Sequence, residues 1–217
     1  MEVFLYFIFS SLQVLSIFYL SYSLFRFKLR SYLGETVFFS MIVAGIIYFV
    51  RILLDQKAII PLLVAALMIV FVWLVVRVPF FYSVLMVATG YIGFLFIEST
   101  LLFLFDYLKI IFVERVLSLS NQGHIFAVIT NLVMFTLSWW LYRRGYGFAF
   151  SFQKVAFRKR ETILSILVIA LAALAVGMFY YSTIHGHRGL LVAAIINILS
   201  LSALLFISLR REYENNA

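Results

Sequence analysis

The chain alternates between long apolar runs and short polar or charged segments, a pattern typical of a protein that crosses a membrane several times. A transmembrane helix needs about 20 predominantly apolar residues. Seven runs meet or approach this length, at residues 3–25, 36–54, 58–76, 80–105, 125–142, 162–184 and 189–209. The pattern therefore predicts an all-α, polytopic helix bundle forming one domain over residues 1–217, with about seven spans and six as the alternative.

The segment from 106 to 124 decides between these span counts, because it mixes apolar residues with Lys109, Glu114 and Arg115. Its apolar positions do not gather clearly on one helical face. The sequence leaves two possibilities open: the segment extends the fourth span beyond the membrane, or it lies at the membrane interface.

The longest run, Phe80 to Phe105, contains a single ionisable residue, Glu98. As a helix it would measure roughly 39 Å, which exceeds the ~30 Å thickness of a hydrocarbon core. Gly90 and Gly93 lie on nearly one face, and such small residues allow a neighbouring helix to approach closely. A carboxylate inside a span is costly, so we expect Glu98 to face the bundle interior and to mark a ligand or signal path. The alternative is a protonated, hydrogen-bonded side chain that only holds helices together.

Composition agrees with a membrane protein and excludes several classes of chemistry. Of the 217 residues 65% are apolar and 12% charged, and the mean hydropathy is +1.12. The absence of Cys excludes disulfides, thiolate metal sites and cysteine nucleophiles. The sequence carries no nucleotide-binding, metalloprotease or nucleophile-elbow motif. We therefore expect no enzymatic activity and no cofactor, and the net charge of +8 indicates topology and anionic lipid rather than nucleic acid.

The distribution of Lys and Arg predicts the orientation, because cytoplasmic segments carry the excess of positive charge. With seven spans and the N-terminus outside, the inside segments hold twelve Lys and Arg and the outside segments five. We expect the N-terminus outside and the C-terminus inside, in a bacterial cytoplasmic (plasma) membrane.

Polar residues within or beside the spans are the candidates for ligand binding or signal relay. They are Glu98, Asp106, Gln13, Asn131 and Asn197. The amides of Gln13, Asn131 and Asn197 are also the candidate partners of Glu98, and a water-filled cavity open to the outside is the alternative to them. For Asn131 and Asn197 the alternative is an ordinary hydrogen bond between helices.

Two further groups sit outside the apolar runs. The basic loop from Arg143 to Arg160 interleaves cations with Phe, which favours contact with anionic lipid. Its cations are Arg143, Arg144, Lys154, Arg158, Lys159 and Arg160. A solvated topology anchor is the alternative for this loop. His124, His185 and His187 are weak candidates for a metal or pH-sensing site, and otherwise form polar segments beside the headgroups.

In its order of segments the chain resembles the membrane sensor domain of accessory-gene-regulator type quorum-sensing histidine kinases. The resemblance rests on the tight turn between spans 3 and 4, the polar residue within span 4, the basic loop Arg143 to Arg160, and the basic exit Leu209 to Glu212. It covers the whole chain at the level of hydropathy and loop character. The family's phospho-accepting histidine and ATP-binding domain are absent from these 217 residues, which are expected to be a fragment of a sensor or a stand-alone relative.

The resemblance implies a homodimeric receptor for a short, hydrophobic, modified peptide, whose last helix signals to a cytoplasmic kinase region and a response regulator. The peptide-processing protease of such systems uses a Cys nucleophile, which this chain lacks. Two alternatives remain from other classes. One is the solute-binding membrane subunit of a transporter, with Glu98 lining the pocket, and the other is a structural subunit of a membrane complex.

Overall fold

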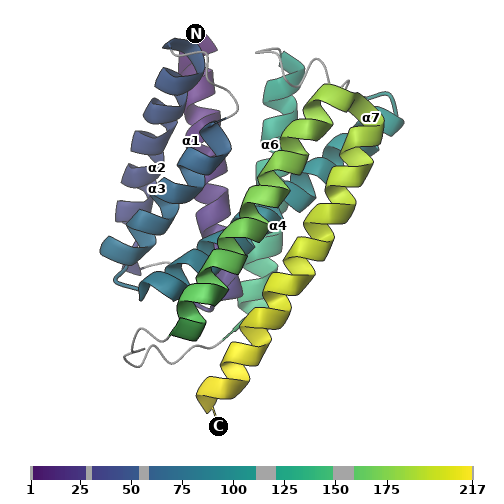
Figure 1. Ribbon diagram of the computed structural model, residues 1–217. Coiled ribbons are helices and arrows are strands. Elements are labelled where there is room, and N and C mark those ends of the chain that lie inside the picture. Colours follow the sequence, from purple (N-terminus) through teal and green to yellow (C-terminus); the bar gives the residue numbers. More distant parts are fainter. Residues whose placement is uncertain (1, 28–30, 54–58, 111–120, 149–158, 217) are drawn as a thin grey trace.

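Every regular element in the described part of the computed structural model is a helix (Figure 1). The structure describes residues 2–27, 31–53, 59–110, 121–148 and 159–216. The elements are α1 (Glu2–Leu24), α2 (Leu33–Tyr48), the short π-helix η2 (Phe49–Leu53), α3 (Ile60–Leu74), α4 (Phe80–Tyr107), α6 (Asn121–Arg144) and α7 (Lys159–Asn216). Apolar runs form helices because a helix satisfies all its interior backbone hydrogen bonds within one segment.

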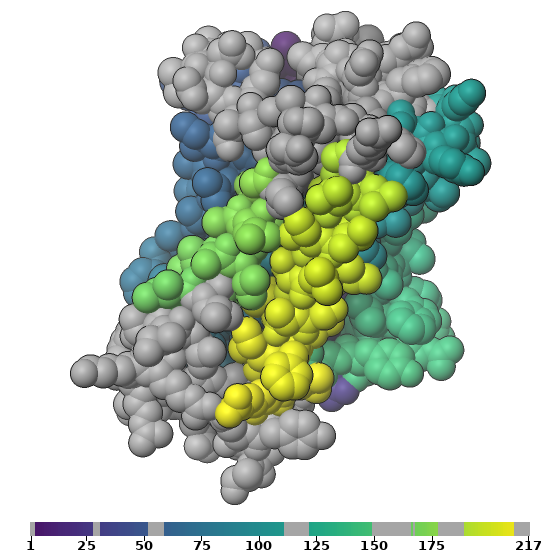
Figure 2. Space-filling view, turned by 45° about the vertical axis from the view of Figure 1, so that its right-hand side comes forward, coloured from purple at the N-terminus to yellow at the C-terminus, as the bar shows by residue number. Residues whose placement is uncertain are grey.

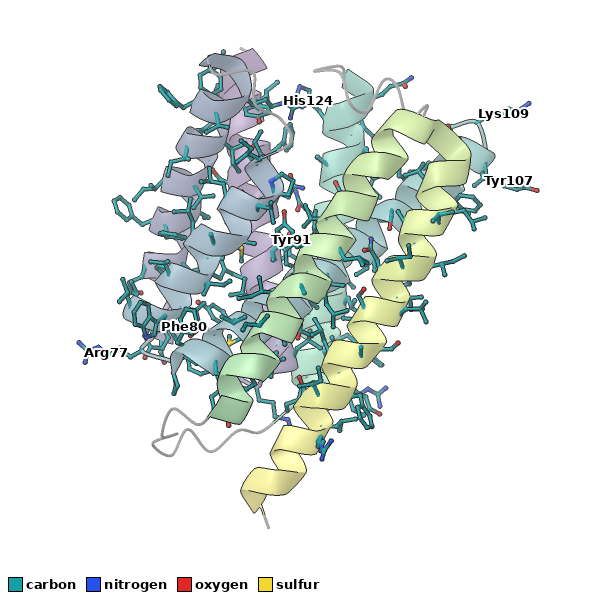
Figure 3. All side chains as sticks on the ribbon, viewed as in Figure 1. Arg77, Phe80, Tyr91, Tyr107, Lys109 and His124 are labelled. Carbon is teal, nitrogen blue, oxygen red and sulfur yellow. The ribbon has the colours of Figure 1, made fainter. Side chains whose placement is uncertain are left out.

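The helices pack side by side as a bundle; η2 continues α2, and the successive α-helices run in alternating directions (Figure 1). Helix α7 folds back on itself, so that a first arm (green) is followed by a second arm (yellow) running the opposite way. The two ends of the described chain lie at opposite ends of the bundle, which we call the N end and the C end. Tyr107, Lys109 and His124 lie at the N end, and Arg77 and Phe80 at the C end (Figure 3).

Helix α4 forms the centre of this bundle. Every residue from Phe81 to Leu95 is buried, so this helix is covered on all sides along more than half its length. It packs most extensively against α7 and also against α1 and α3. Two of its buried hydroxyls are satisfied within the helix, since Thr89 Oγ1 donates to the Leu85 carbonyl and Ser99 Oγ to the Leu95 carbonyl. An all-round apolar helix with internally bonded hydroxyls suits this position.

Glycines on α4 allow α1 to cross it closely, as their spacing predicts. A Cβ atom built on Gly90 would lie 3.0 Å from Cα of Ser21, and one on Gly93 would lie 3.0 Å from Cδ2 of Leu20. At Gly90 the neighbouring atom is backbone, so a side chain there requires movement of α1, whereas at Gly93 the Leu20 side chain must shift. The expected role of these glycines in helix packing is confirmed, and α1 is the helix that they admit.

Five of the described helical stretches are long and apolar enough to cross a membrane. They are Val3–Leu24, Leu33–Arg51, Phe80–Tyr107, Gln122–Arg144 and Gly189–Arg210. Two shorter apolar helices, Ile60–Leu74 and Val168–Gly177, correspond to the predicted third and sixth spans. The all-helical class and the multi-pass character are therefore supported, while the count of seven remains a prediction. The predicted fourth span ends two residues later than expected, at Tyr107, and residues 111–120 lie outside the described ones.

The same hydrogen-bonding motif ends α1, α4 and α6. In α4 the Lys109 N–H donates to the Asp106 carbonyl and the Ile110 N–H to the Phe105 carbonyl, with Lys109 at φ 56°. Arg26 occupies the equivalent position after α1 at φ 50°, and Gly145 occupies it after α6 at φ 69°. This C-terminal cap usually carries glycine in the left-handed position. Here two of the three positions carry a basic residue, and its positive charge interacts favourably with the negative end of the helix dipole.

Candidate functional site: a polar layer inside the bundle

The carboxylate of Glu98 lies in the half of α4 nearer the N end, and its side chain is partly buried. It makes no hydrogen bond or salt bridge to any residue that the structure describes. The carboxylate interacts electrostatically with Tyr91, which lies two turns earlier on the same helix and midway along the bundle (Figure 3). An intramembrane carboxylate without a paired cation needs another source of neutralisation.

Asn131 joins two helices. Ser16 Oγ of α1 lies 3.0 Å from Asn131 Oδ1 of α6 and donates a hydrogen bond to it, and both residues are buried. The same hydroxyl lies 2.8 Å from the Gln13 carbonyl oxygen of its own helix. The interhelical hydrogen bond considered for Asn131 is thus present, with a serine from the first apolar run as its partner.

Asn197 of α7 is 0% exposed, and neither its Nδ2 nor its Oδ1 has a hydrogen-bond partner among the residues that the structure describes. It belongs to a buried stripe on the second arm of α7 that recurs every three to four residues. The stripe consists of Leu190, Ala193, Asn197, Ser200, Leu204 and Ser208. Burying two amide atoms without hydrogen bonds lowers the stability of the fold, and it is unusual because buried polar groups are nearly always paired.

The register between helices places these polar residues at one level of the bundle. On the antiparallel helices α1 and α4, Ser21 lies opposite Gly90. Moving eight residues along each helix, to Gln13 and to Glu98, keeps the two positions level because both helices rise equally per residue. By the same reasoning Leu201, which lies next to Gly93, places Asn197 at the level of Ile97. We call Gln13, Ser16, Glu98, Asn131 and Asn197 the polar layer; it spans about one helical turn.

Four of the five residues singled out from the sequence lie at this level of the bundle, and among the layer's side chains the hydrogen bond between Ser16 and Asn131 is the contact that the structure shows. Asp106 lies eight residues beyond Glu98 on α4, roughly 12 Å further toward the N end. It is partly buried and belongs to the end of the helix rather than to the layer. Whether any of these residues binds a ligand remains a prediction.

Three contributors to this region were not singled out from the sequence: Ser16, Thr130 and Tyr91. Thr130, beside Asn131 on α6, is buried, and its Oγ1 has no hydrogen-bond partner within the described part of the chain. Serine and threonine are common in apolar helices and usually bond to their own backbone, as Ser11 and Thr136 do here. Their sequence positions therefore carry no signal, and only the packing of α1 against α6 selects them.

The C end carries the cations of the basic loop that the structure describes. The guanidinium of Arg143 lies 5.1 Å from the ring centre of Trp139, and that of Arg144 lies 6.0 Å from that of Trp140. Both tryptophans are about half exposed, which suits a membrane interface belt. Lys159 and Arg160 begin α7 at this same end. Lys154 and Arg158 lie outside the described residues.

The histidines form no metal site in the described part of the chain, where no three potential ligands come together. The ring of His124 stacks on that of Phe9, with centroids 5.2 Å apart, at the N end. His185 and His187 lie within α7, and their side chains are outside the described ones.

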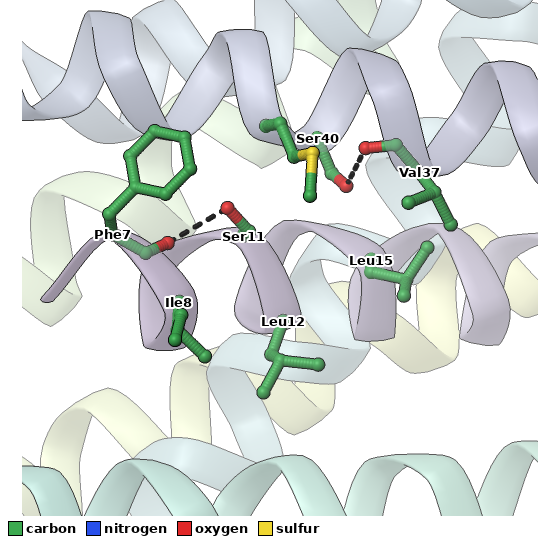
Figure 4. Close-up of a pocket in the computed structure, with 8 residues that line it drawn as sticks. Phe7, Ile8, Ser11, Leu12, Leu15, Val37 and Ser40 are labelled. Carbon is green, nitrogen blue, oxygen red and sulfur yellow. Dashed lines mark hydrogen bonds between the residues drawn. The ribbon is translucent and has the colours of Figure 1, made fainter. Parts of the chain in front are cut away.

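The described surface has two shallow apolar crevices, and the polar layer lines neither. The first lies between α1 and α2 and is lined by Phe7, Ser11 and Ser40, among others (Figure 4). The hydroxyls of the two serines donate hydrogen bonds to backbone carbonyls of their own helices. The second lies among α1, α4, α6 and α7 around Gly93 and Leu201. They hold about 160 and 200 Å³, below the roughly 300–1,000 Å³ of drug-sized ligand sites.

Comparison with known proteins supplies no relative from which a function can be transferred: no family model, curated protein or solved structure matches this chain.

Proposed function

We propose that this chain is a multi-pass receptor module of a bacterial cytoplasmic membrane. It binds an extracellular hydrophobic signal, expected to be a peptide, and passes it to a cytoplasmic kinase region. The observation that carries the proposal is the packing of the buried helix α4 along α7, whose second arm reaches the C end as continuous helix. A rigid helix packed on the centre of a bundle can transmit a shift or rotation from one membrane face to the other.

The proposed orientation has seven spans, the N end outside and the C end in the cytoplasm. It is supported by Arg77, which Figure 3 labels at the C end, by Arg26 and Arg143, which lie where α1 and α6 end, and by Arg210 near the end of α7. The exposed tryptophans beside Arg143 and Arg144 fit the headgroup level of the inner leaflet. Figure 2 shows the second arm of α7 on an outer face of the bundle, where a second copy can pack against it in the proposed homodimer.

A chimera tests the receptor function. Residues 1–217 replace the membrane domain of a histidine kinase of the resembling class, and one to four alanines are inserted at the junction after α7. Each alanine rotates the following helix by about 100°. We expect autophosphorylation to rise and fall with insert length, and hydrophobic peptides to shift it. Output independent of both insert length and peptide would contradict the proposal.

A transporter subunit is the second candidate, and the polar layer favours it, since intramembrane carboxylates and amides also line solute and ion paths. The two functions predict different results with purified protein. A transporter subunit requires solute uptake into vesicles with its coupling partner, whereas a receptor changes kinase output without moving solute.

A further inference from the structure

The second crevice is an apolar furrow between α6 and the second arm of α7. In the described part of the chain α6 packs mainly on α1 and α7 mainly on α4, so the two helices leave a gap beside the central helix. Gly93 of α4 lines this gap together with Phe96 and Ile97. The other lining residues are pairs of leucines one turn apart on three helices: Leu20 and Leu24, Leu137 and Leu141, and Leu201 and Leu205. None of these lining residues carries a polar side chain.

This crevice leads toward the C end of the bundle. Helices α1 and α6 and the second arm of α7 all run toward that end, so the later leucine of each pair lies nearer to it (Figure 1). Leu24 is the last residue of α1, and Leu141 lies in the last turn of α6. The half-exposed Trp139 and Trp140 lie at the same level of α6, as expected at the depth of lipid headgroups. An apolar chain in the crevice therefore begins close to the headgroups.

Two arginines from different helices lie where the crevice meets the C end. Arg144 follows Leu137 by about two helical turns, so both lie on the same face of α6. Arg26 lies just beyond Leu24, and its Nη2 donates a hydrogen bond to the carbonyl of Gly145, the residue after Arg144. Both side chains are exposed, and neither has a carboxylate partner among the residues that the structure describes. Two positive charges beside one apolar crevice favour a ligand that joins an anionic group to a hydrocarbon chain.

Backbone contacts tie the ends of α1 and α6 together, so the two arginines hold their positions relative to the crevice. The Phe148 N–H donates to the Leu24 carbonyl over 2.7 Å, and the rings of Phe148 and Phe25 lie with their centroids 5.6 Å apart. Gly147 permits this approach, because a Cβ there would lie 2.6 Å from the Leu24 carbonyl oxygen. A ligand that bridges the two helix ends therefore meets groups that are already in place.

We propose that this crevice binds one anionic phospholipid of the leaflet at the C end. Its phosphate accepts hydrogen bonds from Arg26 and Arg144, and one acyl chain lies along the leucines of α1, α6 and α7. The crevice is shallow, so the chain lies along it with one side in the bilayer. A zwitterionic lipid is disfavoured, because its ammonium group brings a third positive charge to the two guanidiniums. The bound lipid fills the gap between α6 and the second arm of α7.

This inference does not rest on the receptor function, since lipid binding is a property of the isolated chain. The full chain is purified in an uncharged maltoside detergent and titrated with radiolabelled phosphatidylglycerol or phosphatidylcholine. Phosphatidylglycerol should saturate near one molecule per chain and bind more tightly than phosphatidylcholine. Glycerol 3-phosphate, which offers the phosphate without acyl chains, should not displace it. Equal binding of the two lipids, lack of saturation, or displacement by glycerol 3-phosphate at similar concentrations overturns the proposal.

Variants with matched controls locate the phosphate site. Arg26→Gln and Arg77→Gln each remove an exposed cation at the C end, from positions with φ of 50° and 61°. Arg26→Gln and Arg144→Gln should each weaken phosphatidylglycerol binding about tenfold, as expected for the loss of a charge-assisted hydrogen bond. Arg77→Gln should bind like the parent, because Arg77 follows α3 and lies away from the lining residues. Unchanged binding in Arg26→Gln and Arg144→Gln, or an equal loss in Arg77→Gln, contradicts the site.

A second pair of variants locates the acyl chain. Leu137→Trp fills this crevice and should weaken phosphatidylglycerol binding. Leu12→Trp makes the same change in the crevice between α1 and α2 and should leave the binding unchanged. Equal effects of the two substitutions would show that the chain does not occupy the crevice beside α7.

A direct measurement covers variants that do not fold. Phosphatidylglycerol with a diazirine in one acyl chain is bound to the parent at one molecule per chain and photolysed, and the cross-linked residues are identified by mass spectrometry. Cross-links should concentrate on the leucines of this crevice, such as Leu137, Leu141 and Leu201. Equal labelling of the exposed face of α3, around Leu62 and Val70, would contradict a specific site.

Discussion

Gly90 of α4 lies directly against Ser21 of α1, so closely that an added Cβ would come within 2.9 Å of Ser21 Cβ and 3.0 Å of its Cα. The contact involves backbone on both helices, and rotation of the serine side chain alone cannot relieve it. It fixes the register that brings Gln13 level with Glu98. Because Gly90 sets the register between α1 and α4, it also sets which residues of the polar layer lie at the same level.

Gly90→Ala should destabilise the bundle by about 1–3 kcal/mol, because α1 must move outward to admit the methyl group. Reversible unfolding in mixed micelles measures the change. Gly177→Ala is the matched control, since a Cβ there would meet nothing within 4 Å. Adding Ser21→Gly to Gly90→Ala should recover part of the loss. Equal effects of Gly90→Ala and Gly177→Ala would show that the crossing is looser than described.

The hydrogen bond between Ser16 and Asn131 should couple α1 to α6. In a double-mutant cycle with Ser16→Ala and Asn131→Leu, we expect a coupling free energy of about 0.6 kcal/mol, typical of hydrogen bonds between membrane helices. Ser202, whose hydroxyl bonds to the Ile198 carbonyl of its own helix, is the control partner for the same cycle. Coupling to Ser202 as large as to Ser16 would argue against a specific pair.

Lys109→Gly should stabilise the protein by about 1 kcal/mol, because glycine adopts the positive φ at this helix end without steric cost. The change is read from the midpoint of unfolding. Arg26→Gly at the equivalent position should give a smaller gain in stability or none. Arg26 Nη2 donates a hydrogen bond to the Gly145 carbonyl, and the glycine variant loses this bond. A larger gain from Arg26→Gly would show that this hydrogen bond contributes nothing.

The proposed orientation predicts the behaviour of reporters fused after Ala217. A reporter active only in the cytoplasm should be active there, and one active only outside should be silent. Both fusions are checked for equal expression in the membrane. Activity of the external reporter alone would reverse the orientation or change the parity of the span count.

The basic loop should prefer anionic lipid. A synthetic peptide of residues 143–160 is expected to bind anionic vesicles more strongly than zwitterionic ones, with each cation near the surface contributing about 1 kcal/mol. Neutral replacements of Arg158, Lys159 and Arg160 should weaken this binding, as measured by vesicle sedimentation. Unchanged binding would leave the loop as a solvated anchor.

The sequence by itself determined the class of protein, because length and apolarity suffice to predict helices in a bilayer. It predicted α4 from Pro79 onward and the close-packing role of its glycines, both of which depend on local residue type. It also identified Glu98 and the three amides, because a polar group within an apolar run is visible without knowing its neighbours.

Only the tertiary structure decided what surrounds these groups. Asn131 found its partner in Ser16, 115 positions away in the sequence, and Asn197 found none among the described residues. No local pattern distinguishes these two asparagines, since each is a lone amide in an apolar helix. The difference arises from helix register, which α1 and α4 set at Gly90 and Ser21. Register depends on contacts between distant segments, and a hydropathy pattern contains no information about them.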